Sequence, residues 1–152
     1  TTPYSRVDSR LEIASPDRQL TKSPARFRGM TPPAFGNGAV VIAGKGPLVC
    51  LDTDTGDDWI ADPQRAARRL RWKADSLTNC VAVALTADAV VAVGPAGSGA
   101  GPALQVLELN DGSVRATKPL PSPPLPGGLC VSRDGRVIVV LKQGTVLCYA
   151  AE

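Results

Sequence analysis

The stretch Pro33–Asp58, PAFGNGAVVIAGKGPLVCLDTDTGDD, decides the fold that the sequence predicts. Its centre, Ala39–Ala43, is rich in β-branched residues and carries no charge, as expected of a strand covered on both faces. The flanking segments Gly36–Gly38 and Gly44–Gly46 contain residues that tolerate positive φ, which tight hairpin turns need. A further strand is expected over Leu48–Asp52. The stretch therefore predicts short strands joined by tight turns.

The same pattern returns twice along the chain. Segments 88–93 and 136–141 repeat the central strand, and segments 104–109 and 145–150 repeat the strand that follows it. With Val40, Val90 and Val137 taken as equivalent, the spacings are about 50 and 47 residues. Self-similarity at 40 to 50 residues, with several short strands in each unit, is typical of the blades of a β-propeller.

The segment Cys50–Gly56, CLDTDTG, followed by Trp72, resembles the repeat of quinoprotein-like β-propellers, also called PQQ-like repeats. That repeat has a small residue, Leu, Asp, two free positions, Thr-Gly and then a Trp. Its Trp falls about four residues after the glycine, whereas Trp72 falls sixteen residues after Gly56. Residues 57–70 are therefore interpreted as an insertion, with Trp72 in the docking role. The second unit lacks the Trp, and the resemblance covers roughly residues 32–150.

The resemblance implies an all-β fold: a partial β-propeller of four-stranded antiparallel blades, here a C-terminal fragment of about three blades. The expected divisions are an N-terminal arm (1–31), a blade with a helical insertion at 57–70 (32–78), a second blade with a Gly-rich loop and a Pro-rich connection (79–128), and a third, incomplete blade (129–152). A propeller usually needs at least four blades. The chain is thus the end of a longer polypeptide, one of several copies that share a ring, or a small β-sandwich instead.

The N-terminal arm and the insertion each allow two interpretations. Residues Val7–Ile13 alternate in polarity and could form one outer strand of a blade, or an irregular arm along the surface. In the insertion, Asp62 and Pro63 can begin a short helix. Arg65, Arg68 and Arg69 would then share one helix face. This basic face is either a docking patch for an acidic partner or anionic lipid, or a solvated surface that balances nearby carboxylates.

Three carboxylates near the first turn suggest a calcium site. Asp52, Asp54 and Asp57 are close enough in sequence to converge on a hard cation. However, the segment lacks the glycine position and the distal Glu of an EF-hand loop. The repeat also explains Asp52 and Thr55-Gly56 as turn-forming residues whose side chains bond to the backbone. Calcium is therefore the weaker interpretation.

The composition excludes several functions. The chain of 152 residues has no histidine, which removes a Ser-His-Asp triad, a Cys-His pair, a His-ligated zinc site and a c-type haem attachment. A net charge of +3 is too small to indicate a nucleic-acid partner. The longest apolar runs are far shorter than the ~20 residues that a membrane-spanning helix requires.

The four cysteines, Cys50, Cys80, Cys130 and Cys148, form no CxxC motif, and each falls in a predicted strand. They are expected to be small buried apolar residues, with a disulfide that includes Cys80 as an alternative. Nothing in their spacing supports a metal site.

Three classes of function remain open. The preferred one is a non-catalytic module that acts as a protein-interaction scaffold or as a subunit of a larger propeller or complex. Its partner would be another protein or the remaining blades, and no cofactor is expected. The second is part of a PQQ-dependent quinoprotein dehydrogenase, which would bind the quinone with calcium. The third is a carbohydrate- or lipid-facing surface module. The resemblance also implies an extracytoplasmic bacterial setting, in the periplasm or at the cell surface.

Overall fold

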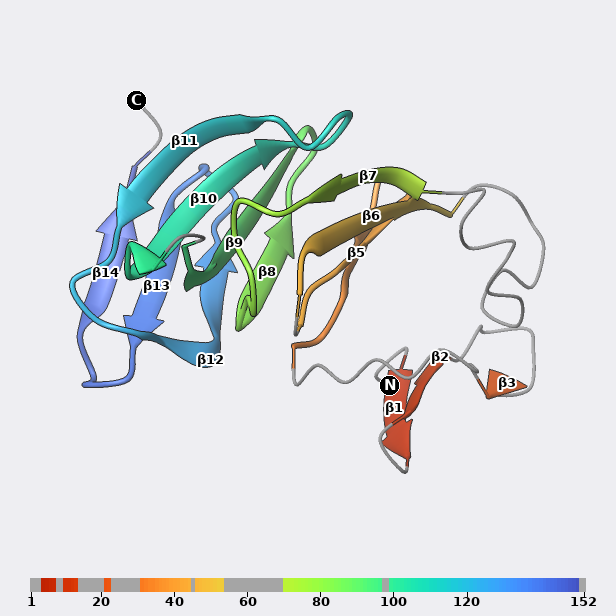
Figure 1. The fold of residues 1–152 in the computed structure, drawn as a ribbon, viewed down its shortest axis with the longest axis horizontal. Helices are drawn as coiled ribbons and strands as arrows, with labels where there is room; N and C mark the ends of the chain where they lie inside the picture. The colour runs from red at the N-terminus through yellow and green to blue at the C-terminus, as the bar shows by residue number, and fades with distance from the viewer. Residues whose placement is uncertain are drawn as a thin grey trace.

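A computed structural model describes residues 31–44, 46–53, 70–96 and 99–150, together with the backbone of three short strands nearer the N-terminus. These residues form four antiparallel sheets (Figure 1). In each sheet the strands that follow one another in sequence are also neighbours in space, so every sheet is a simple meander.

The first sheet has the order β1-β2-β3. Its strands are β1 (Tyr4–Val7), β2 (Arg10–Ile13) and β3 (Thr21–Lys22). Segment 7–13, expected as one outer strand, is instead divided between β1 and β2. The two strands form a hairpin because Val7 pairs with Arg10 and Tyr4 with Ile13.

The second and third sheets have four strands each, in the orders β4-β5-β6-β7 and β11-β10-β9-β8. The strands are β4 (Ala34–Gly36), β5 (Ala39–Ile42), β6 (Leu48–Asp52), β7 (Leu70–Ala74), β8 (Ala82–Leu85), β9 (Ala89–Pro95), β10 (Pro102–Glu108) and β11 (Val114–Pro119).

The last sheet contains β12 (Pro124–Val131), β13 (Val137–Leu141) and β14 (Val146–Tyr149). This sheet begins before the predicted boundary at residue 129. Part of the proline-rich segment 118–128 is a strand and not a connection. Pro119 ends β11, and β12 starts already at Pro124. The strand tolerates its prolines and glycines because the pairing of β12 with β13 is irregular between Pro124 and Leu129.

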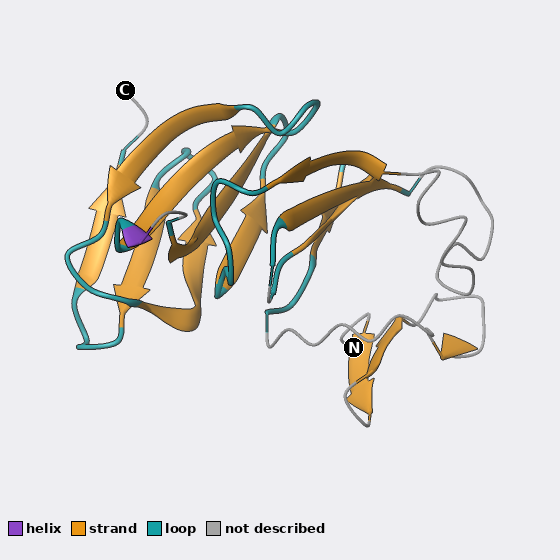
Figure 2. Cartoon of the chain, in the orientation of Figure 1, coloured by secondary structure: helices purple, strands orange, loops and turns teal. Residues whose placement is uncertain are grey.

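The predicted repeat corresponds to real structural equivalence. Val40, Val90 and Val137 lie in β5, β9 and β13, which are the second strands of their sheets. The first strand of the third sheet, β8, contacts both β4 and β12. At the second of these contacts, the Gly127 amide donates a hydrogen bond of 2.9 Å to the Val81 carbonyl. The three sheets therefore stack with their first strands together (Figure 2), and the fold is a partial β-propeller, as the sequence predicted.

Two apolar layers hold this stack together. One lies between β4–β7 and β8–β11 and is centred on fully buried residues such as Val41, Leu48 and Leu107. The other lies between β8–β11 and β12–β14 and includes Val93 and Val139, both fully buried. In these three stacked sheets, we call the face that points toward the C-terminal end of the series the forward face and the opposite one the backward face.

Trp72, in β7, joins the second sheet to the third. Its indole Nε1 donates a hydrogen bond of 2.7 Å to the Leu109 carbonyl, and the side chain is only 6% exposed. The ring lies against Gly112, in the turn between β10 and β11. A Cβ atom at Gly112 would stand 2.7 Å from two ring atoms, and its φ of +74° is a conformation that favours glycine. The predicted docking role of Trp72 is thus confirmed.

Gly112→Ala is expected to destabilise the protein by about 2–4 kcal/mol, because it adds backbone strain and an overlap with the indole. Gly144→Ala is the matched control, since Gly144 also has a positive φ (+89°) but a Cβ atom there would meet nothing within 4 Å. The control should cost only about 1 kcal/mol. Urea unfolding measures both. Equal losses in the two variants would mean that the contact with Trp72 contributes nothing.

Candidate interaction surface

The structure describes one of the six residues proposed as site candidates. Asp54, Asp57, Arg65, Arg68 and Arg69 lie outside the described residues. Asp52, at the end of β6, accepts a hydrogen bond of 2.7 Å from Nε of Arg71 on the adjacent strand β7. The Asp52 carboxylate is thus already paired with a guanidinium. Among the residues with described positions, no three His, Cys, Asp or Glu side chains gather as metal ligands.

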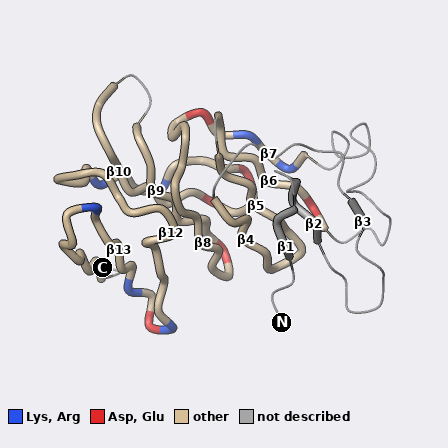
Figure 3. The backbone as a smooth tube through the Cα atoms, turned by 90° about the horizontal axis from the view of Figure 1, so that it is seen from below, with Lys and Arg blue, Asp and Glu red and all other residues tan. Residues whose placement is uncertain are grey.

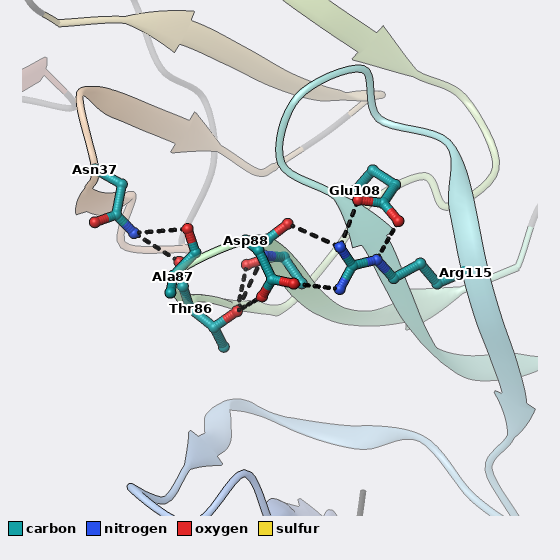
Figure 4. Close-up of polar contacts among 7 residues, drawn as sticks. Asn37, Thr86, Ala87, Asp88, Glu108 and Arg115 are labelled. Atoms are coloured by element: carbon teal, nitrogen blue, oxygen red, sulfur yellow. Dashed lines mark hydrogen bonds and ion pairs between the residues drawn. The ribbon is translucent and has the colours of Figure 1, made fainter. Parts of the chain in front are cut away.

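A polar cluster ties the turns at one edge of the second and third sheets (Figure 4). Arg115 on β11 binds both carboxylate oxygens of Glu108 on β10, and its Nη1 donates to Asp88 at 2.9 Å. Nearby, the Asn37 amide donates to the Thr86 carbonyl at 2.8 Å. Asn37 lies in the β4–β5 turn, so this last bond joins two sheets. The cluster consists of hydrogen-bonded ion pairs and a hydrogen bond between two sheets, which indicates a structural role.

The electrostatics of this cluster follow from Arg115. Its guanidinium, which donates to Asp88, lowers the pKa of that carboxyl below its usual value. The two carboxylates in turn raise the pKa of Arg115. In the β10–β11 turn, the pKa of Asp111 is also lowered because its carboxylate accepts the Ser113 amide at 2.8 Å.

Asp88→Asn is expected to lower the melting temperature at pH 7 by only a few degrees (~1–3 °C), since the pair is exposed to solvent. The pKa of Asp88 is lower in the folded state than in the unfolded state, so its contribution is present above the unfolded pKa and is lost as the pH falls through the folded pKa. Melting curves of both proteins from pH 7 to pH 2.5 should therefore converge at low pH. A difference that stays constant over this range would show that the ion pair is not its cause.

The cysteines divide into two pairs. Cys50 and Cys80 are buried, and burial raises the pKa of Cys50 to about 11 and that of Cys80 to about 12. Cys130 and Cys148 are exposed, contrary to the expectation that all four are buried. Cys80 also precedes β8 rather than lying in a strand. All four are free thiols, so the alternative of a disulfide is not observed.

Cys130 and Cys148 mark an apolar surface on the last sheet. Ile138 of β13 pairs with Cys130 on one side and with Cys148 on the other, so the three side chains share one face. Val140 pairs with Val146 two residues further on and belongs to the same face. We call these five residues the open face. The strands β12, β13 and β14 contain no charged residue (Figure 3).

The opposite, backward face of this sheet is covered. Val139 and Leu141 are 0% and 1% exposed there, in the layer shared with the third sheet, whereas Val146 on the open face is 60% exposed. The third sheet covers the backward face of the last sheet. No sheet among the described residues covers the open face in the same way. Sequence reasoning missed this surface because an exposed strand face and a covered one have the same apolar composition. The equivalence of Val40, Val90 and Val137 was the sequence signal that placed the last sheet in the series.

Comparisons with known proteins support the fold alone. Neither protein-family models nor curated proteins match the sequence. Among solved structures, the computationally designed protein Ika4 is similar at a TM-score of 0.63 and 15% identity, over 98% of this chain and 89% of Ika4. The designed protein Ika8 has a TM-score of 0.61 and 15% identity, over 97% of this chain and 45% of Ika8. BamB from Moraxella catarrhalis has a TM-score of 0.49 and 15% identity, over 97% of this chain and 48% of BamB, a likeness too weak to support an argument.

Proposed function

We propose that this chain is a non-catalytic β-propeller module that serves as a protein-interaction scaffold or as a subunit within a larger propeller or complex. The open face carries the proposal. Soluble proteins rarely leave contiguous apolar surfaces uncovered, and those that do usually bind something there. The face is also built from the positions that form the contacts between sheets elsewhere in the chain.

The lack of histidine supports a non-catalytic role, because the chain has no residue of the type most often used as a general base. The polar cluster around Arg115 is consistent with this, since each of its charges is paired with another protein group. The part of the chain that the structure describes contains no helix long and apolar enough to span a membrane. An extracytoplasmic setting remains part of the proposal and depends on the resemblance to PQQ-like repeats.

The native mass of the chain, purified from its source with whatever remains bound, tests the proposal. A stable assembly well above the 15.7 kDa of one chain is expected. The Val146→Glu variant, expressed in the same source, should lose that assembly because a carboxylate in a desolvated apolar contact is unfavourable. A monodisperse 15.7 kDa monomer with a cooperative melt would contradict the proposal.

The proposal also predicts that the chain does not bind the quinone cofactor PQQ. Titration of the purified chain with PQQ and Ca²⁺ should leave both the quinone absorbance and the melting temperature unchanged. A saturable spectral change with a rise in melting temperature would favour the alternative of a quinoprotein dehydrogenase, because a ligand that binds the folded state stabilises it. Asp52→Asn then serves as the control for calcium, since it removes the only described member of the proposed ligand set.

A further inference from the structure

We propose that Asn37 is a site of spontaneous deamidation that the contact between the second and third sheets holds in check, and that its conversion to aspartate or isoaspartate weakens this contact. The site lies in the turn between β4 and β5 and is independent of what binds the open face. Three observations lead to it: the sequence of the turn, its backbone conformation, and the hydrogen bonds of the Asn37 side chain.

The turn contains an asparagine–glycine pair in a tight conformation. Asn37 has a φ of +50° and Gly38 a φ of +67°, which asparagine–glycine hairpin turns adopt. Asparagine is a chemically labile residue, and a following glycine favours the reaction because it has no Cβ atom to hinder its own amide nitrogen. The other two asparagines of the sequence, Asn79 and Asn110, precede cysteine and aspartate. Asn37 is therefore the most reactive asparagine of the unfolded chain.

The reaction needs no reagent other than water. The backbone nitrogen of Gly38 attacks Cγ of Asn37, and the new C–N bond closes a five-membered succinimide ring. The Cγ–Nδ2 bond breaks, and the proton lost by the attacking nitrogen leaves with Nδ2 as ammonia. Water then adds to one of the two ring carbonyls and opens the ring. The product is aspartate or isoaspartate, depending on which C–N bond the water breaks.

The folded structure opposes this reaction by holding the turn from two sides (Figure 4). Nδ2 of Asn37 donates to the Thr86 carbonyl at 2.8 Å and to the Ala87 carbonyl at 3.2 Å, both in the turn between β8 and β9. The Gly38 carbonyl accepts the Thr53 amide at 2.8 Å. Ring closure requires the Asn37 side chain and the following peptide bond to rotate toward each other. These hydrogen bonds resist that rotation.

Deamidation therefore reports the opening of the contact between the two sheets. Local openings of a folded protein expose groups that the closed state protects, and the reaction rate then follows the population of the open form. Since loss of ammonia is irreversible, each reaction converts a transient opening into a permanent change.

The product is unsuited to the contact that the asparagine makes. A carboxylate at position 37 can only accept hydrogen bonds, whereas the groups opposite it are the carbonyls of Thr86 and Ala87, which also only accept. Both bonds between the sheets are lost, and oxygen atoms face one another. In isoaspartate the backbone also gains a methylene group, which alters the geometry of a two-residue turn. The modified chain therefore closes this contact less well.

The first test compares reaction rates at the three asparagines. The full purified chain is incubated in mildly alkaline buffer, folded or unfolded in urea, and its peptides are analysed by mass spectrometry. We expect Asn37 to react fastest in urea and about tenfold or more slowly in the folded chain. Equal rates at Asn37 in the two states overturn the protective role of the fold. A rate in urea no higher than those of Asn79 and Asn110 overturns the assignment of the site.

Two variants show whether the contact between the sheets is responsible. Gly112→Ala disturbs the packing of Trp72 on the third sheet and should speed deamidation of folded Asn37 about tenfold. Gly144→Ala lies in the turn between β13 and β14 and should change the rate less than about twofold. Equal acceleration in both variants overturns the role of the contact. If Gly112→Ala does not fold, wild type in urea below its unfolding transition replaces it. A rate that stays flat up to the transition then overturns that role.

The effect of the product is measured with a second pair of variants. Asn37→Asp should lower the melting temperature by about 3–6 °C, because two bonds between the sheets are lost. Asn79→Asp is the matched control, since Asn79 is also exposed and has a φ of +55°, and it introduces the same charge away from this contact. It should cost about 1 °C or less. Equal melting temperatures of Asn37→Asp and wild type overturn the claim that deamidation weakens the contact.

Discussion

The contact of Trp72 with the β10–β11 turn is the interaction on which the arrangement of the sheets depends. The indole is buried, donates its N–H to the Leu109 carbonyl, and lies where a side chain at Gly112 would have to be. An unpaired carbonyl at this depth would be costly, so the hydrogen bond and the packing specify a single position of the ring. Because the Trp comes from the last strand of one sheet and the turn joins the last two strands of the next, the contact sets which faces of the two sheets meet.

Once the facing surfaces of the two sheets are set, the burial of a residue in a later sheet follows from the position of that sheet in the stack. Cys50 and Cys148 have the same pairing and the same residue type, yet one is fully buried and the other is exposed. The difference comes from what lies beyond the sheet and not from the strand itself. A propeller module therefore exposes, on its last sheet, a surface built like an interior layer, and this accounts for an uncharged face in a chain with 20% charged residues.

The strands and their repeat could be predicted from the sequence because they depend on local signals, whereas the docking role of Trp72 was predicted from the resemblance to PQQ-like repeats. The turn at Gly36–Gly38 and the uncharged run of β-branched residues in Ala39–Ala43 are recognisable without tertiary information. The start of β12 at Pro124 could not be predicted in this way, because proline is tolerated there only through an irregular pairing with β13. The hairpin of β1 and β2 was missed because Val7–Ile13 was interpreted as one alternating strand, although the three consecutive polar residues Asp8–Arg10 interrupt the alternation.

The open face was harder to predict than the fold, because the exposure of a strand depends on what lies beyond its sheet. Nothing in the sequences VIVVL and VLCY distinguishes a strand that is covered on both faces from one that is covered on one. The direct measurement is hydrogen exchange of residues 137–149 in the isolated chain and in the complex purified from its source, with β9 as the internal reference. Greater protection of β13 and β14 in the complex, with β9 unchanged, is the expected result. Exchange of β13 and β14 that is the same in the two samples would contradict the proposal that the open face is an interaction surface.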